Sequence, residues 1–467
     1  MTRFTWTSQR IRDALSLGRG RTPDRRYTGV STDSRTVQAG DLFVALRGDR
    51  FDGTEFVAAA AAAGATGAVV QSQPPDIEGR IEIFLVDDTL KALGRLASAR
   101  RQVLDPAVVA ITGTTGKTTT REFAAAALGE GGYASPGNFN NLVGLPLSIL
   151  AAPEEAGVWV LEVASNSPGE IERLAAIAEP DCAVITSVSE GHLEGLGDYQ
   201  GVMKEKLGLL SGLRAGGSAL VADEPEDLAR EARQRCADVR TVGLGTGADE
   251  RPAEWSASEQ GIRWRWRGTE FQLQGFGTHL IRDALFALAV GGLFGRKPED
   301  MATRLSVAKL PPMRGEVRRI GDLLLLVDCY NANPASFRAA IESLRLLAGT
   351  RRRAVLAGTM LELGVRSAVL HAEIADEMMR AGIEVIALTG GFAAAYEHAT
   401  ARPSGELIVA DELDPAYRQL AERLRGNEAV LLKASRGMKF ERAIPLFERD
   451  FGVATASGSN GLVANGG

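Results

Sequence analysis

The segment from Gly113 to Thr119 restricts the fold more than any other part of this sequence. It reads Gly-Thr-Thr-Gly-Lys-Thr-Thr, follows the apolar run Val108–Ile111 and precedes a helix expected over residues 117–128. A short apolar run of this kind is typical of a buried parallel strand. Glycines let the backbone approach phosphate oxygens closely, and the helix N-terminus adds N–H donors. We predict a nucleotide-binding loop formed by Gly113, Thr114, Thr115, Gly116, Lys117, Thr118 and Thr119.

Two side chains of this loop have predicted roles with ATP. Lys117 can reach the β- and γ-phosphates, and the Thr118 hydroxyl suits a Mg²⁺ ligand. The general motif G-x-x-x-x-G-K-[ST] would place its first glycine at position 111, which is Ile111. The alternative is a chance Gly/Thr-rich turn before a helix. The strand before the loop and the Lys-Thr-Thr-Thr after it favour the nucleotide site.

The chain length and the order of apolar runs predict three α/β domains. At 467 residues the chain is too long for one hydrophobic core. We expect a small α/β N-terminal domain over residues 1–103, a central P-loop ATPase-like parallel sheet over 104–312 and a C-terminal Rossmann-like domain over 313–467. The expected strands of the second and third domains lie at residues 108–111, 158–161, 183–186, 218–221, 323–327, 354–356, 385–388 and 430–432.

Composition excludes several classes of protein. The net charge of −6 disfavours a nucleic-acid partner, and no segment approaches the ~18 apolar residues of a membrane span. The first residues lack the apolar region of a signal peptide, so we expect a cytoplasmic protein without membrane insertion. Three widely spaced cysteines, Cys182, Cys236 and Cys329, predict buried free thiols.

Three further residues could complete a phosphoryl-transfer site. Glu162 ends the run Val158–Leu161 and therefore lies at the carboxyl edge of the predicted sheet, where a magnesium ligand is more plausible than an ordinary loop acid. His192 could bind a metal, although a loop histidine is more often a surface residue. Lys206 has the position of a solvated helix lysine, and an ammonium group has no lone pair for Mg²⁺.

Together these residues resemble the Mur ligases, which are ATP-dependent amide-bond-forming enzymes of peptidoglycan synthesis with three domains. The resemblance rests on the loop G-x-x-G-K-T-T, the glutamate after the next strand, and a histidine followed fourteen positions later by a lysine. It extends from about Ser31 to Ile444.

Other segments are most similar to the branch of the family that uses UDP-N-acetylmuramoyl-tripeptide and D-alanyl-D-alanine. They are Ser31–Arg35, Gly40–Leu46, Phe51–Gly53, Gly137–Asn141 with Gly144–Pro146, Pro168–Ile171, His192–Gly195 and Asp328–Pro334. In the family the N-terminal domain holds the UDP-sugar. The resemblance therefore implies substrate contacts by Ser31, Asp33, Ser34, Arg35, Phe51, Asp52 and Gly53.

The resemblance also implies the chemistry and the remaining site residues. ATP phosphorylates the substrate carboxylate, and the incoming amine attacks the acyl phosphate. The implied catalytic residues are Lys117, Glu162, His192 and Lys206. Thr118 and Glu162 would bind one Mg²⁺, and Glu162, His192 and a carbamylated Lys206 would bind a second. The implied nucleotide contacts outside the loop are Asn138, Asn141, Asp283, Asp328, Tyr330, Asn331 and Asn333. We expect a monomer.

Several positions depart from the family pattern. Ala164 replaces a glycine, Lys206–Leu209 reads K-L-G-L instead of K-G-E-I, and Asp283 replaces an asparagine. Two alternatives therefore stay open: a Mur-type ligase with a different amino donor, or a nucleotide-binding scaffold without turnover. The retained Glu162, His192 and Lys206 argue against the scaffold, because a pure binder needs no second metal site.

Overall fold

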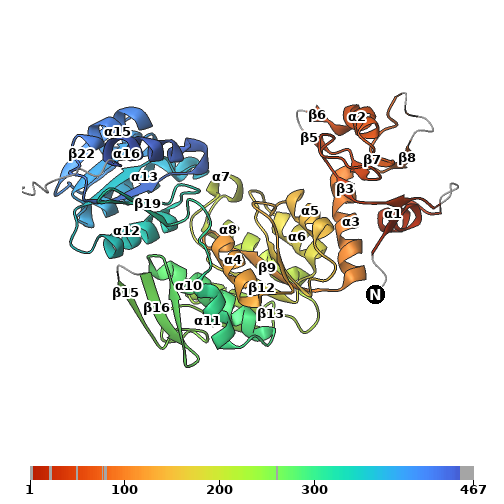
Figure 1. Cartoon of the computed structure of the whole chain (residues 1–467), viewed down its shortest axis with the longest axis horizontal. Coiled ribbons are helices and arrows are strands. Elements are labelled where there is room, and N and C mark those ends of the chain that lie inside the picture. The colour runs from red at the N-terminus through yellow and green to blue at the C-terminus, as the bar shows by residue number, and fades with distance from the viewer. Residues whose placement is uncertain are drawn as a thin grey trace, which may run out of the picture. The chain divides into compact units, whose positions relative to one another are not determined.

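The computed structural model describes residues 4–19, 24–48, 51–75, 77, 81–258 and 261–452. The chain divides into two compact units. Unit 1 comprises Met1–Trp255, Arg263–Leu273 and His279–Ala308, and unit 2 comprises Ser256–Ile262, Gln274–Thr278 and Lys309–Gly467. Both units contain largely parallel sheets covered by helices, which confirms the predicted α/β class (Figure 1). The domain limits at residues 103 and 312 stay predictions.

The centre of unit 1 is a six-stranded parallel sheet. Its strand order is β10 (Gly132–Ala134), β11 (Val158–Glu162), β9 (Ala107–Thr112), β12 (Cys182–Ile185), β13 (Ser218–Ala222) and β14 (Asp238–Val242). The strands β9, β11, β12 and β13 are buried almost throughout, as expected for a parallel sheet covered on both faces. The carboxyl ends of β9, β11 and β12 therefore lie side by side at one edge.

Helices follow the strands of this sheet. Those that matter for the site are α4 (Lys117–Leu128), α5 (Gly144–Ala151), α6 (Glu170–Ala178), α7 (Leu193–Leu196), α8 (Tyr199–Leu207), α9 (Glu226–Arg233), α10 (Thr278–Leu293) and α11 (Pro298–Ser306). Helix α4 begins at the predicted residue and packs against β9, β10 and β11. A three-stranded sheet, β15 (Glu254–Ser258), β16 (Gly261–Trp266) and β17 (Thr269–Leu273), contains the hairpin around Gly268.

The N-terminal part of unit 1 has its own parallel sheet. Its order is β3 (Val30–Ser31), β4 (Leu42–Val44), β7 (Gly67–Val70) and β8 (Glu82–Leu85), accompanied by α1 (Ser8–Leu15) and α2 (Val57–Ala62). The long helix α3 (Thr89–Leu104) packs against α1 and β7 and also against α5 and α6 (Figure 1). Buried Arg100 donates to the carbonyl oxygens of Ile149 and Ala152, which fixes α3 to the end of α5.

Unit 2 contains a six-stranded mixed sheet. Its order is β18 (Glu316–Ile320), β19 (Leu323–Val327), β23 (Ala429–Lys433), β20 (Arg353–Ala357), β21 (Val385–Thr389) and β22 (Glu406–Ala410), with only β18 antiparallel. The main helices are α12 (Pro334–Ala348), α13 (Ser367–Arg380), α15 (Leu413–Ala421) and α16 (Ile444–Phe451). The sequence predicted the four inner strands but not the partly exposed edge strands β18 and β22.

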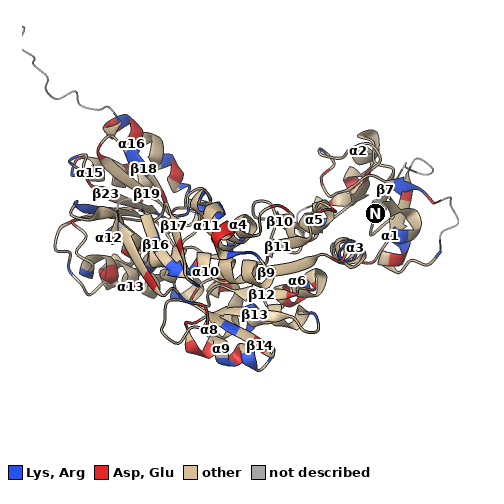
Figure 2. Ribbon diagram, turned by 60° about the horizontal axis from the view of Figure 1, so that its bottom comes forward, with Lys and Arg blue, Asp and Glu red and all other residues tan. Residues whose placement is uncertain are grey.

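Charged side chains of both signs share the surface of the described part of the chain. Helix α9, for example, carries acidic residues in its first turn and arginines in its last (Figure 2). The three cysteines are buried and free, as predicted. Within the described ranges, no helix has both the length and the apolar character needed to cross a membrane.

Candidate active site

The predicted nucleotide loop lies between the carboxyl end of β9 and the first turn of α4. Gly113 and Gly116 have φ values of 153° and 83°. A Cβ atom on Gly113 would collide with the Thr186 hydroxyl, and one on Gly116 would collide with the Asp283 carboxylate. Glycine is therefore required at both positions, because other side chains lie directly against the backbone.

Hydrogen bonds to the segment after β12 fix the shape of the loop. The N–H of Thr114 donates to the carbonyl oxygen of Ser187 at 3.0 Å, and the N–H of Thr115 donates to the Ser187 hydroxyl at 2.8 Å. The Thr186 hydroxyl donates to the carbonyl oxygen of Thr115 at 2.5 Å. The loop is thus held by contacts across the sheet edge.

Lys117 folds back over this loop. Its ammonium group donates to the carbonyl oxygens of Gly113 at 2.6 Å and Thr114 at 3.4 Å. This places a positive charge beside the backbone that would surround a phosphate group. Thr118 follows directly, in the first turn of α4, and is partly buried.

Glu162 is the last residue of β11 and lies at the same sheet edge, as predicted from the sequence. Its side chain is 3% exposed. Arg121 donates to Oε2 at 3.2 Å, and Asn140 donates to Oε1 at 2.8 Å. Each carboxylate oxygen therefore has one protein donor, and this orients the group while leaving lone pairs for a further ligand.

Lys206 is buried. Its position in the sequence alone predicted a solvated helix lysine, and that prediction is wrong. Its side chain is 1% exposed and forms no hydrogen bond or ion pair with a described residue. Burial and then the positive charge of Lys117 lower the pKa of Lys206 to about 7, against the opposing effect of Glu205 and Glu170. A substantial fraction of this amine is neutral at pH 7.

The burial of Lys206 follows from how α8 packs against α6. Its neighbour Glu205 is also buried and accepts hydrogen bonds from the N–H groups of Gly169 at 2.6 Å and Ile171 at 2.8 Å. A carboxylate at the first turn of a helix is favourable because of the free N–H groups there. This contact holds the end of α8, which carries Lys206, against the start of α6.

His192 precedes α7 and is partly buried, with a left-handed φ of 55°. No three His, Cys, Asp or Glu side chains in the described part of the chain lie close enough to hold a metal ion. The predicted metal ligands include only two side chains of those types, Glu162 and His192. The other two predicted ligands are the Thr118 hydroxyl and a carbamylated Lys206, which are groups of other types. The metal sites therefore stay a prediction.

The other predicted nucleotide contacts of unit 1 have different environments. Asp283 of α10 is buried and lies against Gly116. Among the predicted contacts of unit 1 outside the nucleotide loop, it is therefore Asp283 that the structure brings to that loop. Asn141 accepts from the N–H groups of Val143 and Gly144 at 3.1 and 2.8 Å, at the start of α5. Asn138, three residues before Asn141, is exposed.

In unit 2 the predicted nucleotide contacts follow β19. Asp328 accepts from the buried Lys433 ammonium at 2.6 Å, and the Asn331 carbonyl accepts from it at 3.2 Å. Asn333 caps α12 through the Ser336 N–H at 2.9 Å. The Arg314 guanidinium lies over the Tyr330 ring at 4.3 Å.

The predicted sugar contacts lie near the carboxyl ends of β3 and β4. Ser31 ends β3, and the Asp33 carboxylate pairs with Arg35 at 2.6 Å. The hydrogen bonds from Arg35 lower the pKa of Asp33 to about 2. Phe51 is 56% exposed. The N–H of Gly53 donates to the carbonyl oxygen of Leu46. This bond brings the segment Phe51–Gly53 to the same edge of the N-terminal sheet as the segment Ser31–Arg35. Ser34 and Asp52 belong to these two segments.

Sequence reasoning missed three residues that shape this site. Arg121 lies four residues after Lys117 on α4, a spacing that puts both on one helix face and could have revealed it. Asn140 is part of the quoted Gly137–Asn141 segment but was not predicted as a contact. Ser187 lies in a loop and gave no sequence signal.

Three family models match the chain in order. They are the Mur ligase family, catalytic domain over residues 26–101, the Mur ligase middle domain over 111–291, and the Mur ligase, glutamate ligase domain over 313–436.

Curated relatives and solved structures give the same result. The chain is 36% identical to UDP-N-acetylmuramoyl-tripeptide--D-alanyl-D-alanine ligase of Bacillus subtilis, covering 89% of this chain and 92% of the relative. It is 33% identical to the Escherichia coli enzyme of the same name, covering 82% and 84%. The structure matches MurF from Acinetobacter baumannii with a TM-score of 0.86 at 27% identity, covering 96% and 99%. It matches MurF ligase from Thermotoga maritima in complex with ADP with a TM-score of 0.81 at 29% identity, covering 91% and 97%.

Proposed function

Because this chain belongs to the Mur ligase family, we propose that it uses ATP to join D-alanyl-D-alanine to UDP-N-acetylmuramoyl-tripeptide in peptidoglycan precursor synthesis. The observation that carries the proposal is the Glu162 carboxylate beside a complete phosphate loop, in a chain whose relatives across most of its length bear this ligase name. The loop and Lys117 bind the nucleotide phosphates.

The reaction needs a carboxylate to attack a phosphorus atom, although both groups are negatively charged. Lys117 and the N–H groups of the first turn of α4 offset the charge of the phosphates. The γ-phosphoryl group is transferred to the substrate carboxylate and ADP leaves. The amine of the dipeptide then attacks the acyl carbon, the amide bond forms, and phosphate departs with the former carboxylate oxygen.

The chemistry of the side chains supports the proposal of two magnesium ions. Glu162 is a buried, oriented carboxylate, and Lys206 is a buried amine without a hydrogen-bonding partner among the described residues. A neutral amine with a pKa near 7 can add CO₂ and become an anionic carbamate. We propose that Thr118, Glu162, His192 and carbamylated Lys206 hold the ions, which would supply positive charge at the reacting phosphate. We also propose that the enzyme acts as a cytoplasmic monomer.

One assay distinguishes this proposal from the two alternatives. The purified chain is supplied with ATP, Mg²⁺, UDP-N-acetylmuramoyl-tripeptide and D-alanyl-D-alanine, and phosphate and the pentapeptide product are measured together. We expect stoichiometric formation of both, and neither with Lys117→Ala. Turnover only with another amine would show a different amino donor. Nucleotide binding without turnover, with any amine, would show a scaffold.

A further inference from the structure

Helix α6 begins without a cap from its own N-cap residue. That residue is Gly169, which has no side chain and a left-handed φ of 80°. The first turn of a helix carries N–H groups that have no partner inside the helix, and a Ser, Thr, Asp or Asn side chain at the N-cap usually accepts from one of them. In α6 the acceptor comes from another helix.

The acceptor is the Glu205 carboxylate of α8. Its Oε2 atom accepts from the N–H of Gly169 at 2.6 Å, and its Oε1 atom accepts from the N–H of Ile171 at 2.8 Å. Glu205 is buried, and a buried carboxylate is costly unless hydrogen-bond donors or charges offset the cost. The two N–H groups and the positive end of the helix dipole do so. Glu205 thus joins the last turn of α8 to the first turn of α6.

The start of α8 is held at a different place. Asp198 accepts from the N–H of Gly201 at 2.9 Å and caps the helix, and the Tyr199 hydroxyl donates to Asp227 of α9 at 2.9 Å. Helix α8 is therefore anchored at both ends, and Lys206 directly follows the anchor at its end. Because the Lys206 amine has no hydrogen bond or ion pair with a described residue, its direction depends on how the backbone of α8 is held.

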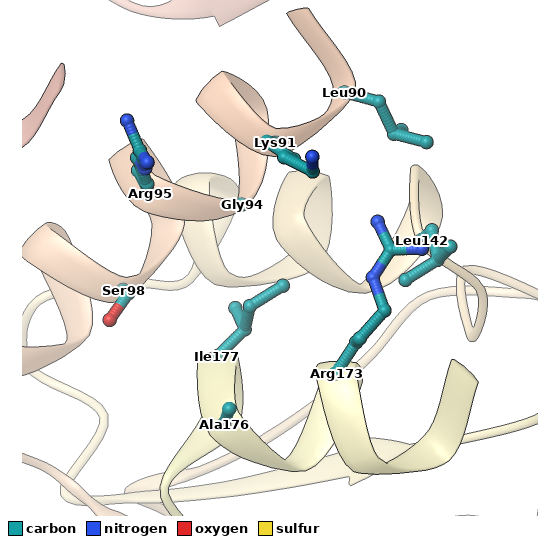
Figure 3. A pocket seen from close by; sticks show the side chains of 9 residues that line it. All are labelled: Leu90, Lys91, Gly94, Arg95, Ser98, Leu142, Arg173, Ala176 and Ile177. Carbon is teal, nitrogen blue, oxygen red and sulfur yellow. The ribbon is translucent and has the colours of Figure 1, made fainter. Parts of the chain in front are cut away.

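The contact of α6 with α8 is separate from its contact with α3. Figure 3 shows that Arg173, Ala176 and Ile177 of α6 face α3 across a cavity of about 360 Å³. Neither Glu205 nor the two residues whose N–H groups it binds line this cavity. Removal of the Glu205 carboxylate should therefore loosen α8 and the start of α6 without a direct effect on the face of α6 toward α3.

The residue three positions after Glu205 shows that a carboxylate could reach the same helix start from elsewhere. Gly208 stands where the family pattern K-G-E-I has its glutamate. Its φ is −56°, and a Cβ atom there would lie 3.5 Å from the backbone nitrogen of Glu172, in the same first turn of α6. Residues three apart lie on one face of a helix. Positions 205 and 208 are therefore both suited to a carboxylate that caps α6.

We propose that Glu205 is a positioning residue for Lys206, and that its carboxylate replaces the glutamate that this chain lacks at position 208. The inference rests on the proposed function, in which a carbamylated Lys206 holds a metal ion. The Glu205 carboxylate is engaged by N–H groups of α6, so it acts through Lys206 and not on the reacting atoms. It holds the turn of α8 that carries the amine, and this fixes the direction of the carbamate.

The test removes the carboxylate and then returns it at the other position. The variants are Glu205→Ala, and Glu205→Ala combined with Gly208→Glu. The matched control is Glu172→Ala, which removes an exposed carboxylate from the same turn of α6. Thermal unfolding followed by circular dichroism shows whether each variant is folded, and Glu205→Gln, which keeps one acceptor oxygen, replaces Glu205→Ala if that variant is not. Steady-state phosphate release gives kcat and the KM for ATP. Electron paramagnetic resonance gives the affinity for Mn²⁺ in bicarbonate buffer without substrates.

We expect Glu205→Ala to lower kcat and the affinity for Mn²⁺ roughly tenfold, the lower end of the effect of losing a group that orients a metal ligand. The KM for ATP should stay unchanged, because the nucleotide loop is held by the segment after β12. The combined variant should recover most of both losses, and Glu172→Ala should match the natural protein. Unchanged kcat and Mn²⁺ affinity in a folded Glu205→Ala would overturn the inference, and so would a combined variant that recovers nothing.

A second comparison separates the positioning of Lys206 from general support of the fold. Glu205→Ala is also combined with Lys206→Ala, which leaves no amine to position. We expect little further loss of kcat relative to Lys206→Ala alone, because the effects of two residues that act through one group are not additive. A tenfold further loss would show that Glu205 only supports the fold, and would overturn the inference. If the natural protein itself shows no ligase turnover, the proposed function is wrong and this role of Glu205 falls with it, whereas the other outcomes leave that function intact.

Discussion

Two of the lysines that the structure describes are buried, one in each unit, and their surroundings differ. Lys433 ends β23 and is 0% exposed; its ammonium group contacts the Asp328 carboxylate at 2.6 Å and lies 5.3 Å from the centre of the Phe337 ring. Lys206 lies in the last turn of α8 and is 1% exposed, but no carboxylate pairs with it among the described residues, and Lys117 adds like charge.

This difference separates a structural lysine from a reactive one. Burying an ammonium ion costs several kcal/mol unless a partner offsets the cost. The Asp328 carboxylate does so for Lys433. Lys206 lacks such a partner, and the cost appears as a pKa lowered to about 7. A protein that retains a buried, partly neutral amine has a nucleophile available, and this favours the proposed carbamate.

The largest effect is expected from removing the reactive lysine. Lys206→Ala removes the amine that forms the proposed carbamate, so kcat should fall by roughly 10²–10³-fold, the usual cost of losing an electrostatic contact in a reaction centre. Short-chain carboxylates such as acetate should restore part of the activity, since they can occupy the space of the carbamate. Steady-state phosphate release measures both effects.

The matched control is Lys204→Ala, an exposed lysine two residues earlier on the same helix. It should keep full activity and show no response to carboxylates. Full activity of Lys206→Ala without added carboxylate would contradict the catalytic role of Lys206. It would then no longer differ from Lys433 in function.

The structural lysine should affect stability instead. Lys433→Met leaves Asp328 partly buried without its partner, and we expect a loss of about 3 kcal/mol in the free energy of unfolding. We place the expected loss at the low end of the range for breaking a buried ion pair, because the Asp328 side chain is 22% exposed. Urea unfolding of unit 2, followed by circular dichroism, measures it.

Two further variants sharpen this result. Lys439→Met changes an exposed lysine of the same unit and should have almost no effect on stability. Combining Lys433→Met with Asp328→Leu removes both charges and should recover most of the loss. If the double variant is no more stable than Lys433→Met, the ion pair is not what stabilises this position.

The sequence predicted those parts of the site that local patterns determine. The apolar run before Gly113, the helix from Lys117 and the carboxylate at the end of β11 all follow from short-range signals, and the structure has them where expected. The four inner strands of unit 2 were predictable for the same reason, because each is a continuous apolar run.

Features that depend on long-range packing were not predictable. In α8 the sequence Lys204-Glu205-Lys206 is as polar as a solvated helix, and the burial of Lys206 depends on long-range packing of α8, which includes the contact of Glu205 with the start of α6. The edge strands β18 and β22 have alternating or partial exposure and so lack an apolar run. Arg121 looked like an ordinary helix arginine, because its partner Glu162 lies 41 residues later in the chain.

Arg121 and Glu162 form a second buried cation–carboxylate pair, with side-chain exposures of 2% and 3%. Unlike Asp328, Glu162 is also a proposed metal ligand. Arg121→Met should leave Asn140 as the sole donor to Glu162, so the carboxylate loses its fixed orientation. We expect a 10–100-fold higher Mg²⁺ concentration for half-maximal rate, as is usual when a group that orients a metal ligand is lost.

Binding of Mn²⁺, followed by electron paramagnetic resonance, measures the same change without turnover. Arg121→Lys keeps the positive charge and should bind the metal more tightly than Arg121→Met. A stronger affinity for Mn²⁺ in Arg121→Met would show that repulsion between the guanidinium and the ion dominates. In that case Arg121 only neutralises the Glu162 carboxylate, as Lys433 neutralises Asp328, and does not position Glu162 for the metal.

The smallest effect concerns the pH dependence of the Lys206 amine. Only a neutral amine adds CO₂. With a pKa of about 7, Lys206 is protonated below that value, and its neutral fraction rises from about one tenth at pH 6 to about nine tenths at pH 8. Addition of CO₂ to the neutral amine also releases a proton, which favours the carbamate further as the pH rises. At a fixed, sub-saturating concentration of dissolved ¹³CO₂, the carbamate signal in the ¹³C NMR spectrum should therefore increase over this range by at least the roughly tenfold rise in the neutral amine, and activation of CO₂-depleted enzyme should follow it. Lys433→Met should leave the signal unchanged because the amine that reacts is at Lys206, whereas Lys206→Ala should abolish it. A signal that grows as the pH falls, or one that survives in Lys206→Ala, would contradict the assignment of Lys206 as the reactive lysine.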